Sequence, residues 1–188
     1  RVDDVLSGHG LTATAITAGD VRIVAGMTWR ALWPRRVIMS GSVPNNASIV
    51  LVVQVDGHVV LLSGDIEPEA QAAISTDLVA YRFDVVKVPH HGSRYQHPSL
   101  TTWERAPVAL ISVGEGNTYG HPSTDTIADW VSHGALVGRT DQGGDLAVVD
   151  EGSGLGGAAR HGMLPSSRAF TPSPAPSGRR RSSSIGPC

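Results

Sequence analysis

The sequence predicts a layered α/β domain with its functional groups at strand ends. Two observations lead to this class. Short runs of β-forming residues separated by turn residues fill the early part of the chain, and strands alternate with helical segments in the later part. With 188 residues, of which 40% are hydrophobic, the chain is long enough for one domain with its own core.

The early part is expected to form hairpins. β-forming residues cluster on both sides of Gly19-Asp20, which indicates a first hairpin, and Pro34 ends a further strand. Pro44-Asn45-Asn46 indicates a turn, and Asp56-Gly57 is typical of a two-residue hairpin turn. The expected strands of this part are 11–18, 21–25, 27–33, 48–55 and 58–63.

The later part is expected to alternate helices and strands. Pro68 and apolar residues at helical spacing predict a helix over 67–78. Val85, Val86 and Val88 are β-branched and predict a buried strand after it. The remaining elements are helices over 99–105 and 123–132, and strands over 84–88, 108–113, 136–139 and 146–149.

Composition excludes several classes of protein. The single cysteine, Cys188, allows no disulfide within the chain and no thiolate-rich zinc site, so any metal would need His, Asp or Glu ligands. The apolar runs are too short to cross a bilayer, and no basic-then-apolar signal opens the chain, so the segment is expected to be soluble. The formal net charge of -2 indicates little about partners.

The two ends of the chain indicate a piece of a longer protein. The chain begins with Arg1, not Met, and we expect a partial domain over residues 1–150. Residues 151–188 are rich in Gly, Ser, Pro and Arg and are predicted to be disordered, because they bury too little apolar surface. Their Arg179-Arg180-Arg181 run either contacts phosphates or is a solvated tail.

Polar side chains follow two of the predicted strands. Pro89 ends one strand, so His90 and His91 should stand beyond the sheet edge, where imidazoles suit metal ligation or proton transfer. A purely structural role is the alternative. Asp65 follows another strand and Gly64, and it is expected to be either a metal ligand or the N-cap of the next helix.

Other candidates are weaker. His121 precedes Pro122, which holds it extended, so its ring either points back across the sheet edge or lies in a surface loop. Asp141 contacts a site or makes a turn, and the turn is favoured. Ser93 lacks the Gly-x-Ser-x-Gly elbow, which argues against a serine hydrolase. The histidines without supporting context, expected at the surface, are His9, His58, His97, His133 and His161.

Five short motifs follow one another between residues 5 and 150. They are Asn45-Asn46-Ala47-Ser48, Ser63-Gly64-Asp65-Ile66-Glu67, Lys87-Val88-Pro89-His90-His91-Gly92-Ser93, Gly114-Glu115-Gly116-Asn117-Thr118-Tyr119-Gly120-His121-Pro122 and Arg139-Thr140-Asp141-Gln142-Gly143-Gly144. This order and spacing closely resemble the carboxy-terminal metallo-β-lactamase-like domain of ComEC competence proteins. The resemblance implies an αββα sandwich that follows a membrane-embedded DNA channel and is thought to hydrolyse the DNA strand that is not imported.

The resemblance also implies roles for single residues. Asp65 would bridge two divalent metal ions and His91 would be a later metal ligand, with His90 binding phosphate or exchanging roles with it. His121 would line the cleft and protonate a leaving oxygen. Ser93 and Asn117 would contact substrate. Mn and Zn are both compatible, and oxygen-rich ligation favours Mn.

The chain departs from the family pattern in its first sixty residues. The His-x-His-x-Asp-His signature that supplies most metal ligands is absent there, and no histidine stands in Ser40-Gly41-Ser42-Val43-Pro44. We therefore expect only the later half of the domain, inactive as a fragment. Its expected partners are single-stranded DNA, the missing amino-terminal half and the membrane channel domain of a bacterial parent protein attached to the cell membrane.

Two other functions fit the same residues. One is a non-catalytic remnant that binds nucleic acid, and the other is a different hydrolase on the same fold, such as a phosphocholine esterase or a lactonase. A sandwich that lacks one half would expose a sheet face, so the fragment is expected to be prone to aggregation.

Overall fold

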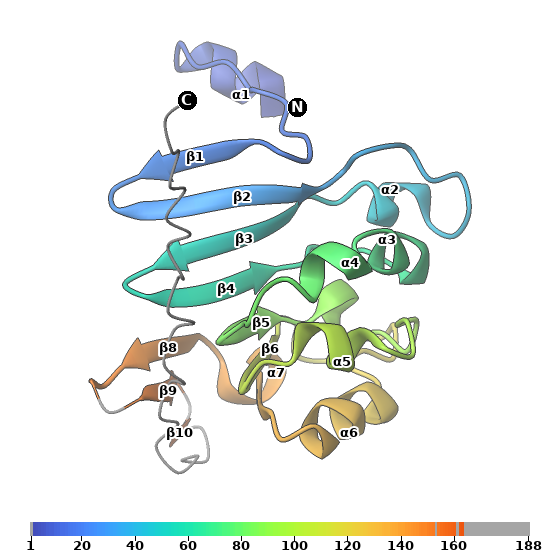
Figure 1. The fold of residues 1–188 in the computed structure, drawn as a ribbon, viewed down its shortest axis with the longest axis vertical. Coiled ribbons are helices and arrows are strands. Elements are labelled where there is room, and N and C mark those ends of the chain that lie inside the picture. Colours follow the sequence, from blue (N-terminus) through green and yellow to red (C-terminus); the bar gives the residue numbers. More distant parts are fainter. Residues whose placement is uncertain (1, 153, 161, 164–188) are drawn as a thin grey trace, which may run out of the picture.

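The computed structural model describes residues 2–152, 154–160 and 162–163. Their main feature is a seven-stranded mixed sheet in the order β1-β2-β3-β4-β5-β6-β7, with a separate three-stranded sheet beside its lower end (Figure 1). The first four strands pair antiparallel, and the pairs from β4 to β7 are parallel. The predicted α/β class is confirmed.

The antiparallel part is a meander of consecutive hairpins. Its strands are β1 (Val21–Val24), β2 (Met27–Trp33), β3 (Val50–Val55) and β4 (His58–Leu62). The turn predicted at Asp56-Gly57 is confirmed, with both residues at positive φ.

The predicted first hairpin is wrong. Residues 11–18 form no strand, and β1 pairs instead with β2 through a turn at Ala25-Gly26. Residues 11–18 are mostly exposed threonines and alanines, so they bury too little side-chain area to hold a strand. The short helix α1 (Val2–Gly8) before them has no buried residue and was not predicted.

The later part alternates helices and strands as predicted, with shorter elements. The strands are β5 (Val85–Lys87), β6 (Val108–Ile111) and β7 (Leu136–Arg139), and the helical segments are α2 (Val43–Asn46), α3 (Pro68–Ala73), α4 (Ser75–Leu78), η1 (Pro89–Gly92), α5 (Leu100–Glu104), α6 (Thr124–Ser132) and α7 (Thr140–Gly143). The single helix predicted over 67–78 is two helices, because the backbone of Ile74 leaves helical geometry at φ -108°, ψ 5°.

A second sheet follows the main one. It consists of β8 (Leu146–Asp150), β9 (Leu155–Ala159) and β10 (Gly162–Met163), paired antiparallel. The chain therefore forms further strands beyond residue 150, where the sequence predicted a disordered tail. Backbone pairing holds β9 in place although its Leu-Gly-Gly-Ala-Ala sequence has little apolar surface. The predicted Arg179-Arg180-Arg181 run lies outside the described residues.

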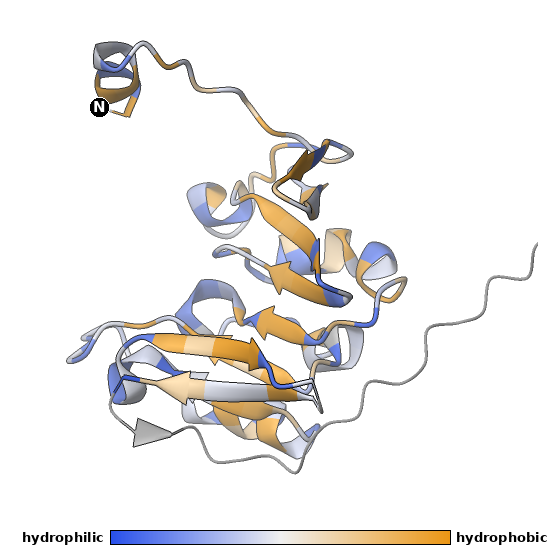
Figure 2. Cartoon of the chain, turned by 90° about the vertical axis from the view of Figure 1, so that its left-hand side faces the viewer, coloured by the Kyte–Doolittle hydropathy of each residue, from blue (hydrophilic) through white to orange (hydrophobic). Residues whose placement is uncertain are grey.

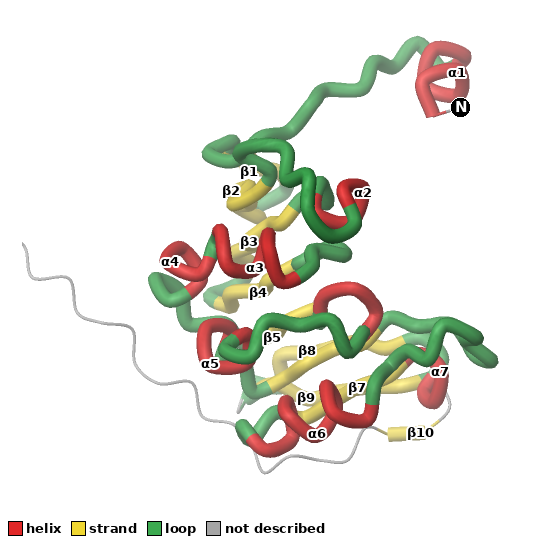
Figure 3. Tube along the Cα trace, turned by 90° about the vertical axis from the view of Figure 1, so that its right-hand side faces the viewer, coloured by secondary structure: helices red, strands yellow, loops and turns green. Residues whose placement is uncertain are grey.

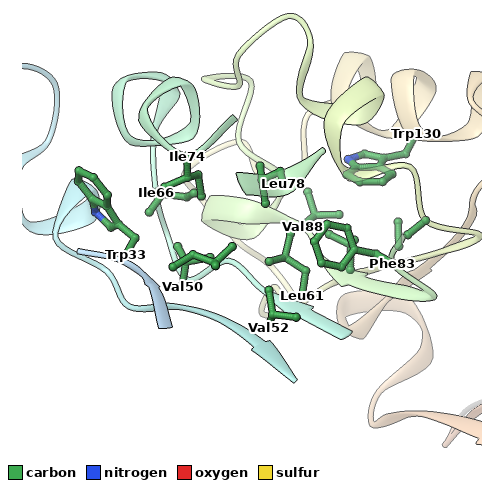
Figure 4. Close-up of a cluster of buried hydrophobic side chains, with 14 of the residues drawn as sticks. Trp33, Val50, Val52, Leu61, Ile66, Ile74, Leu78, Phe83, Val88 and Trp130 are labelled. Carbon is green, nitrogen blue, oxygen red and sulfur yellow. The ribbon is translucent and has the colours of Figure 1, made fainter. Parts of the chain in front are cut away.

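The core lies between the main sheet and the helices α3 to α6, which stand in front of it in Figure 3. Strand register places Leu61, Val86 and Ala109 side by side on this face, and all three are fully buried. They pack in one cluster with Ile66, Ile74, Leu78 and Trp130 from the helical side (Figure 4). Each large side chain buried here contributes roughly 1.5–3 kcal/mol.

The opposite sheet face is less well covered. Register places Trp29, Val53, Val60 and Val85 in one apolar row across it, and Figure 2 shows how hydrophobic the strands are. Val85 is buried, whereas Val53 and Val60 are half-buried and the neighbouring Leu62 is 41% exposed. None of the helices in the described ranges is long and apolar enough to span a membrane.

His58, which the sequence placed at the surface, connects the two sheets. His58 Nε2 lies 3.2 Å from Asp150 Oδ2, and His58 Nδ1 lies 3.7 Å from Asp84 Oδ2. The pKa of Asp150 is lowered, first by the Gly152 N–H and then by His58. The surface prediction for His58 is therefore wrong, because it joins β8 to β4. His161 lies outside the described residues.

Candidate functional site: a histidine cluster at a sheet edge

The predicted site residues converge because β4, β5 and β6 run parallel and end at one sheet edge. Asp65 follows β4, His90 and His91 follow β5, and His121 lies in the loop after β6. The ring centres of His90 and His121 are 5.2 Å apart, those of His90 and His91 are 6.3 Å apart, and His91 Nε2 lies 3.5 Å from Asp65 Oδ2. We call these four residues the histidine cluster.

A strained turn presents the two adjacent histidines. His90 (φ 47°, ψ 47°) and His91 (φ 54°, ψ 26°) both adopt the left-handed conformation, which costs about 1–2 kcal/mol per non-glycine residue. Gly92 continues at φ +73°, and a side chain there would lie 2.8 Å from Pro122 Cβ. The Gly92 carbonyl accepts the Ser123 N–H at 2.8 Å, which ties this turn to the loop of His121. Strain of this kind concentrates at functional sites.

One hydrogen bond fixes the tautomer of His91. Its Nδ1 lies 2.6 Å from the Ser112 carbonyl oxygen, so Nδ1 carries the proton and donates it. The lone pair of Nε2 then faces Asp65 Oδ2 at 3.5 Å. Two electron-rich atoms therefore face each other, an arrangement that suits a cation bound between them.

Lys87 binds the other oxygen of Asp65. Its ammonium donates to the Gly64 carbonyl at 2.6 Å and to Asp65 Oδ1 at 3.2 Å, and the Asp65 N–H donates to Ser48 Oγ at 3.1 Å. Gly64 has φ +58°, and an added Cβ would lie 2.6 Å from Ser48 Cβ. The N-cap alternative for Asp65 is wrong, because α3 begins at Pro68 and Glu67 occupies its N-cap position.

His90 faces a carboxylate and an amide. Its side chain is 18% exposed, with Nδ1 at 3.6 Å from Glu67 Oε1 and Nε2 at 3.5 Å from Asn45 Nδ2. Asn45 Nδ2 donates to Glu67 Oε1 at 3.0 Å, and the Ser42 N–H donates to Glu67 Oε2 at 2.8 Å. Within the described chain, the buried Nδ1 of His90 has no hydrogen-bond partner. This nitrogen is buried and faces the Glu67 carboxylate.

The environment of His121 favours its neutral form. Burial lowers the pKa of His121, and the positive charges of His90 and His91 lower it further, while Asp65 acts in the opposite direction. A neutral imidazole at this position offers one ring nitrogen as a hydrogen-bond acceptor. When an anionic group binds beside it, the protonated form gains stability.

The two predicted substrate contacts differ in their placement. Asn117 Oδ1 accepts the N–H groups of Tyr119 at 2.9 Å and His121 at 3.3 Å, so Asn117 shapes the loop that carries His121. Ser93 is completely buried, and its Oγ accepts the Tyr95 N–H at 3.1 Å. This burial gives Ser93 a structural role in the described chain and no surface for substrate.

Sequence reasoning missed three polar neighbours of the cluster. Lys87, Asn45 and Glu67 all lie within the quoted motifs, but none was assigned a site role. A charged residue at the end of an otherwise apolar strand was the signal in the sequence that could have pointed to Lys87. Asp141 forms a bidentate ion pair with Arg139, and it lies in the short helix α7, where the sequence favoured a turn.

The described residues do not by themselves fit a two-metal centre. In residues 2–152, 154–160 and 162–163, no three His, Cys, Asp or Glu side chains gather closely enough to hold a metal ion. His91 Nε2 and Asp65 Oδ2 form a pair, and the remaining Asp65 oxygen is bound by Lys87.

No protein-family model matches the chain. It is homologous to ComE operon protein 3 of Bacillus subtilis (strain 168), with 30% identity over 139 residues, which are 73% of this chain. The matched region spans 18% of that protein's length. Among solved structures, a Parabacteroides distasonis protein named as a metal-dependent hydrolase gives a TM-score of 0.46 at 15% identity, covering 74% of this chain and 62% of that one.

Proposed function

We propose that this chain is the later half of a phosphodiesterase domain that cleaves single-stranded DNA in a DNA-uptake protein of the ComEC type. The observation that carries the proposal is the histidine cluster, with three imidazoles and a carboxylate at one sheet edge. The homology to ComE operon protein 3 supports the family, and the five motifs support the site.

The cluster suits an anionic phosphodiester. The rings of His90, His91 and His121 lie together at one sheet edge and offer ring nitrogens that can donate to a phosphate oxygen, and the Lys87 ammonium offsets the charge of Asp65. The negative phosphate would raise the pKa of His121 from its lowered value. As a water oxygen bonds to phosphorus and loses a proton to solvent, the P–O bond to the sugar breaks, and a protonated His121 could give its proton to the leaving sugar oxygen.

Metal binding belongs to the complete domain in this proposal. Asp65 and His91 would supply two ligands, and a preceding segment would supply the others and displace Lys87 from Asp65. Divalent cations, Mn or Zn, would neutralise charge on the phosphodiester. The family's fold, an αββα sandwich, requires that segment as well.

The open sheet face supports the missing half as a partner. Trp29, Val53, Val60 and Leu62 present apolar surface that the described residues cover only partly. A second sheet from an amino-terminal half would bury this surface at about 10 Å between sheets. The resemblance of the five motifs to the ComEC family implies the other proposed partners, an amino-terminal half of the domain and a membrane channel domain of a bacterial parent protein at the cell membrane.

The test is DNA cleavage by a chain extended upstream. Labelled single-stranded DNA should be cut in the presence of Mn²⁺, and Asp65→Asn should abolish cutting because it removes the carboxylate charge. Asp125→Asn makes the same change at an exposed position in the first turn of α6 and should leave cleavage intact. Full activity in excess chelator, or unchanged activity in Asp65→Asn, would contradict the proposal.

One observation favours a non-catalytic alternative. The ion pair between Lys87 and Asp65 satisfies the carboxylate that the metal chemistry needs. If the extended chain binds DNA but cuts none at any metal concentration, the protein is a nucleic-acid-binding module that keeps the family's sheet. The Lys87→Met variant separates the two functions, since it frees Asp65 for a metal and should increase metal affinity only in a catalytic domain.

A further inference from the structure

A second polar pocket lies at the opposite end of the parallel strands from the histidine cluster. It has a volume of about 560 Å³ and is lined by Val79, Tyr81, Arg82, Thr102, Trp103 and Arg105. These residues precede β5 and β6, between α4 and α5, which contact each other on the helix-covered side of the sheet (Figure 3). We call it the arginine pocket.

Two aromatic rings of the arginine pocket are held by stacking. Tyr81 stacks on Phe83 with ring centres 5.6 Å apart and an angle of 24° between the planes, and Phe83 is buried in the core. Trp103 stacks on His97 at 4.4 Å and 29°. Rings fixed in this way lose little conformational freedom when a ligand stacks on them.

Two guanidinium groups flank these rings. Arg82 and Arg105 are exposed, and neither forms an ion pair with another described residue. By contrast, the arginines at positions 35, 139 and 160 each form an ion pair with a carboxylate. Unpaired arginines bind phosphate oxygens through two parallel N–H bonds and also stack on planar rings.

We propose that the arginine pocket binds one nucleotide of a single strand, with its base beside Tyr81 or Trp103 and its phosphate on Arg82 and Arg105. Stacking on aromatic side chains together with arginine contacts to phosphate is how proteins bind single strands without reading their sequence. The volume falls within the roughly 300–1,000 Å³ of small-ligand pockets. The choice of a DNA strand as the source of the nucleotide rests on the proposed function.

The test measures binding of a fluorescent oligothymidylate to the full chain by anisotropy, in the presence of chelator. Arg82→Gln with Arg105→Gln should weaken binding by about tenfold and reduce the dependence of log affinity on log salt by about 0.7, because the contacts to one phosphate are lost. The matched control is Arg22→Gln with Arg30→Gln, exposed residues of β1 and β2 that carry the same charge. Equal losses in both pairs, or none in the pocket pair, would overturn the proposal.

A second variant tests the stacking. Tyr81→Leu keeps apolar volume but removes the ring, and it should weaken oligothymidylate binding by roughly tenfold with little change in salt dependence. Unchanged affinity in Tyr81→Leu would overturn the stacking arrangement. If free thymidine monophosphate binds as tightly as the oligonucleotide, the ligand is a free nucleotide and the assignment to a strand is wrong.

The same assay separates this proposal from the proposed function. Asp65→Asn should abolish cleavage in the extended chain, and adding Arg82→Gln with Arg105→Gln to Asp65→Asn should weaken oligothymidylate binding by the same factor as in the unchanged chain, because the two sites lie at opposite ends of the strands. In the pocket variants, we expect cleavage to fall only where oligothymidylate binding also falls. If the extended chain never cuts DNA and the pocket still binds it, only the proposed function fails.

Discussion

Replacing Gly64 with alanine should destabilise the fold far more than the same replacement at Gly57. Gly64 has φ +58°, and the new Cβ would lie 2.6 Å from Ser48 Cβ and 3.2 Å from the Ile49 carbonyl oxygen. Gly57 has φ +84°, and nothing lies within 4 Å of its added Cβ. The two sites therefore share the backbone cost and differ in the steric cost.

The magnitude follows from these two costs. A non-glycine residue in the left-handed region costs about 1–2 kcal/mol, and it applies at both positions. Carbon atoms normally approach to about 3.5–4.0 Å, so the contact at Gly64 forces the backbone to move, which costs a further 1–3 kcal/mol or so. Alanine also lowers the conformational entropy of the unfolded chain, which offsets about 0.4–1 kcal/mol of the loss in stability at each position. Because the backbone cost and the entropy gain are common to both positions, we expect Gly64→Ala to lose about 1–3 kcal/mol more than Gly57→Ala, which itself loses about 0–1.6 kcal/mol.

Urea unfolding followed by tryptophan fluorescence measures this difference. The midpoint should fall further for Gly64→Ala than for Gly57→Ala, with the slope unchanged in both. Adding Ser48→Gly should recover part of the loss, because it removes the atom at 2.6 Å. Equal losses at the two glycines, or no recovery in the double variant, would refute the steric reasoning.

Other predictions concern the cluster, the core and the open sheet face. In NMR titrations, His90→Gln should raise the pKa of His121 because it removes a nearby positive charge, and Asp65→Asn should lower it; shifts of the opposite sign would contradict the assigned causes. Because the pKa of His121 is lowered in the folded protein, the unfolded chain binds more protons as pH falls below about 6.5, so stability should decrease there, and less steeply in His121→Asn, as urea midpoints across pH can show. Leu61→Ala should cost about 2–5 kcal/mol in urea unfolding, whereas Leu62→Ala, at a residue 41% exposed, should cost less than about 1 kcal/mol; similar losses would place the core elsewhere. The isolated chain should self-associate through its open apolar sheet face, and a monodisperse monomer with cooperative thermal unfolding in light scattering and calorimetry would argue against that.

Elements defined by local signals were predicted well. The bounds of β2 and β7 are those that the sequence predicted, and the Asp56-Gly57 turn is present, because turn chemistry and β-forming runs act over a few residues. The break at Ile74 and the pairing of β9 were missed. The β8–β9 hairpin is local, but the Gly-rich sequence of β9 has little β-forming signal, and the break at Ile74 is a backbone departure that the apolar spacing does not reveal.

The sequence also predicted which residues gather at the candidate site, but not the contacts between them. Motifs at strand ends predicted that Asp65, His91 and His121 would meet at one edge, since parallel strands end together. The sequence left open whether Asp65 caps a helix, and only the structure shows Lys87 bound to it.

By itself, the amino-acid sequence determined the α/β class, most strands and the residue types available for chemistry, because hydrophobic periodicity and turn residues are local properties. Tertiary structure alone decided which atoms face each other: the tautomer of His91, the lowered pKa of His121 and the burial of Ser93. These depend on distances of a few ångströms between segments far apart in the chain. The arginine pocket has the same origin, since packing of α5 against α4 brings Arg82 and Arg105 to one cavity.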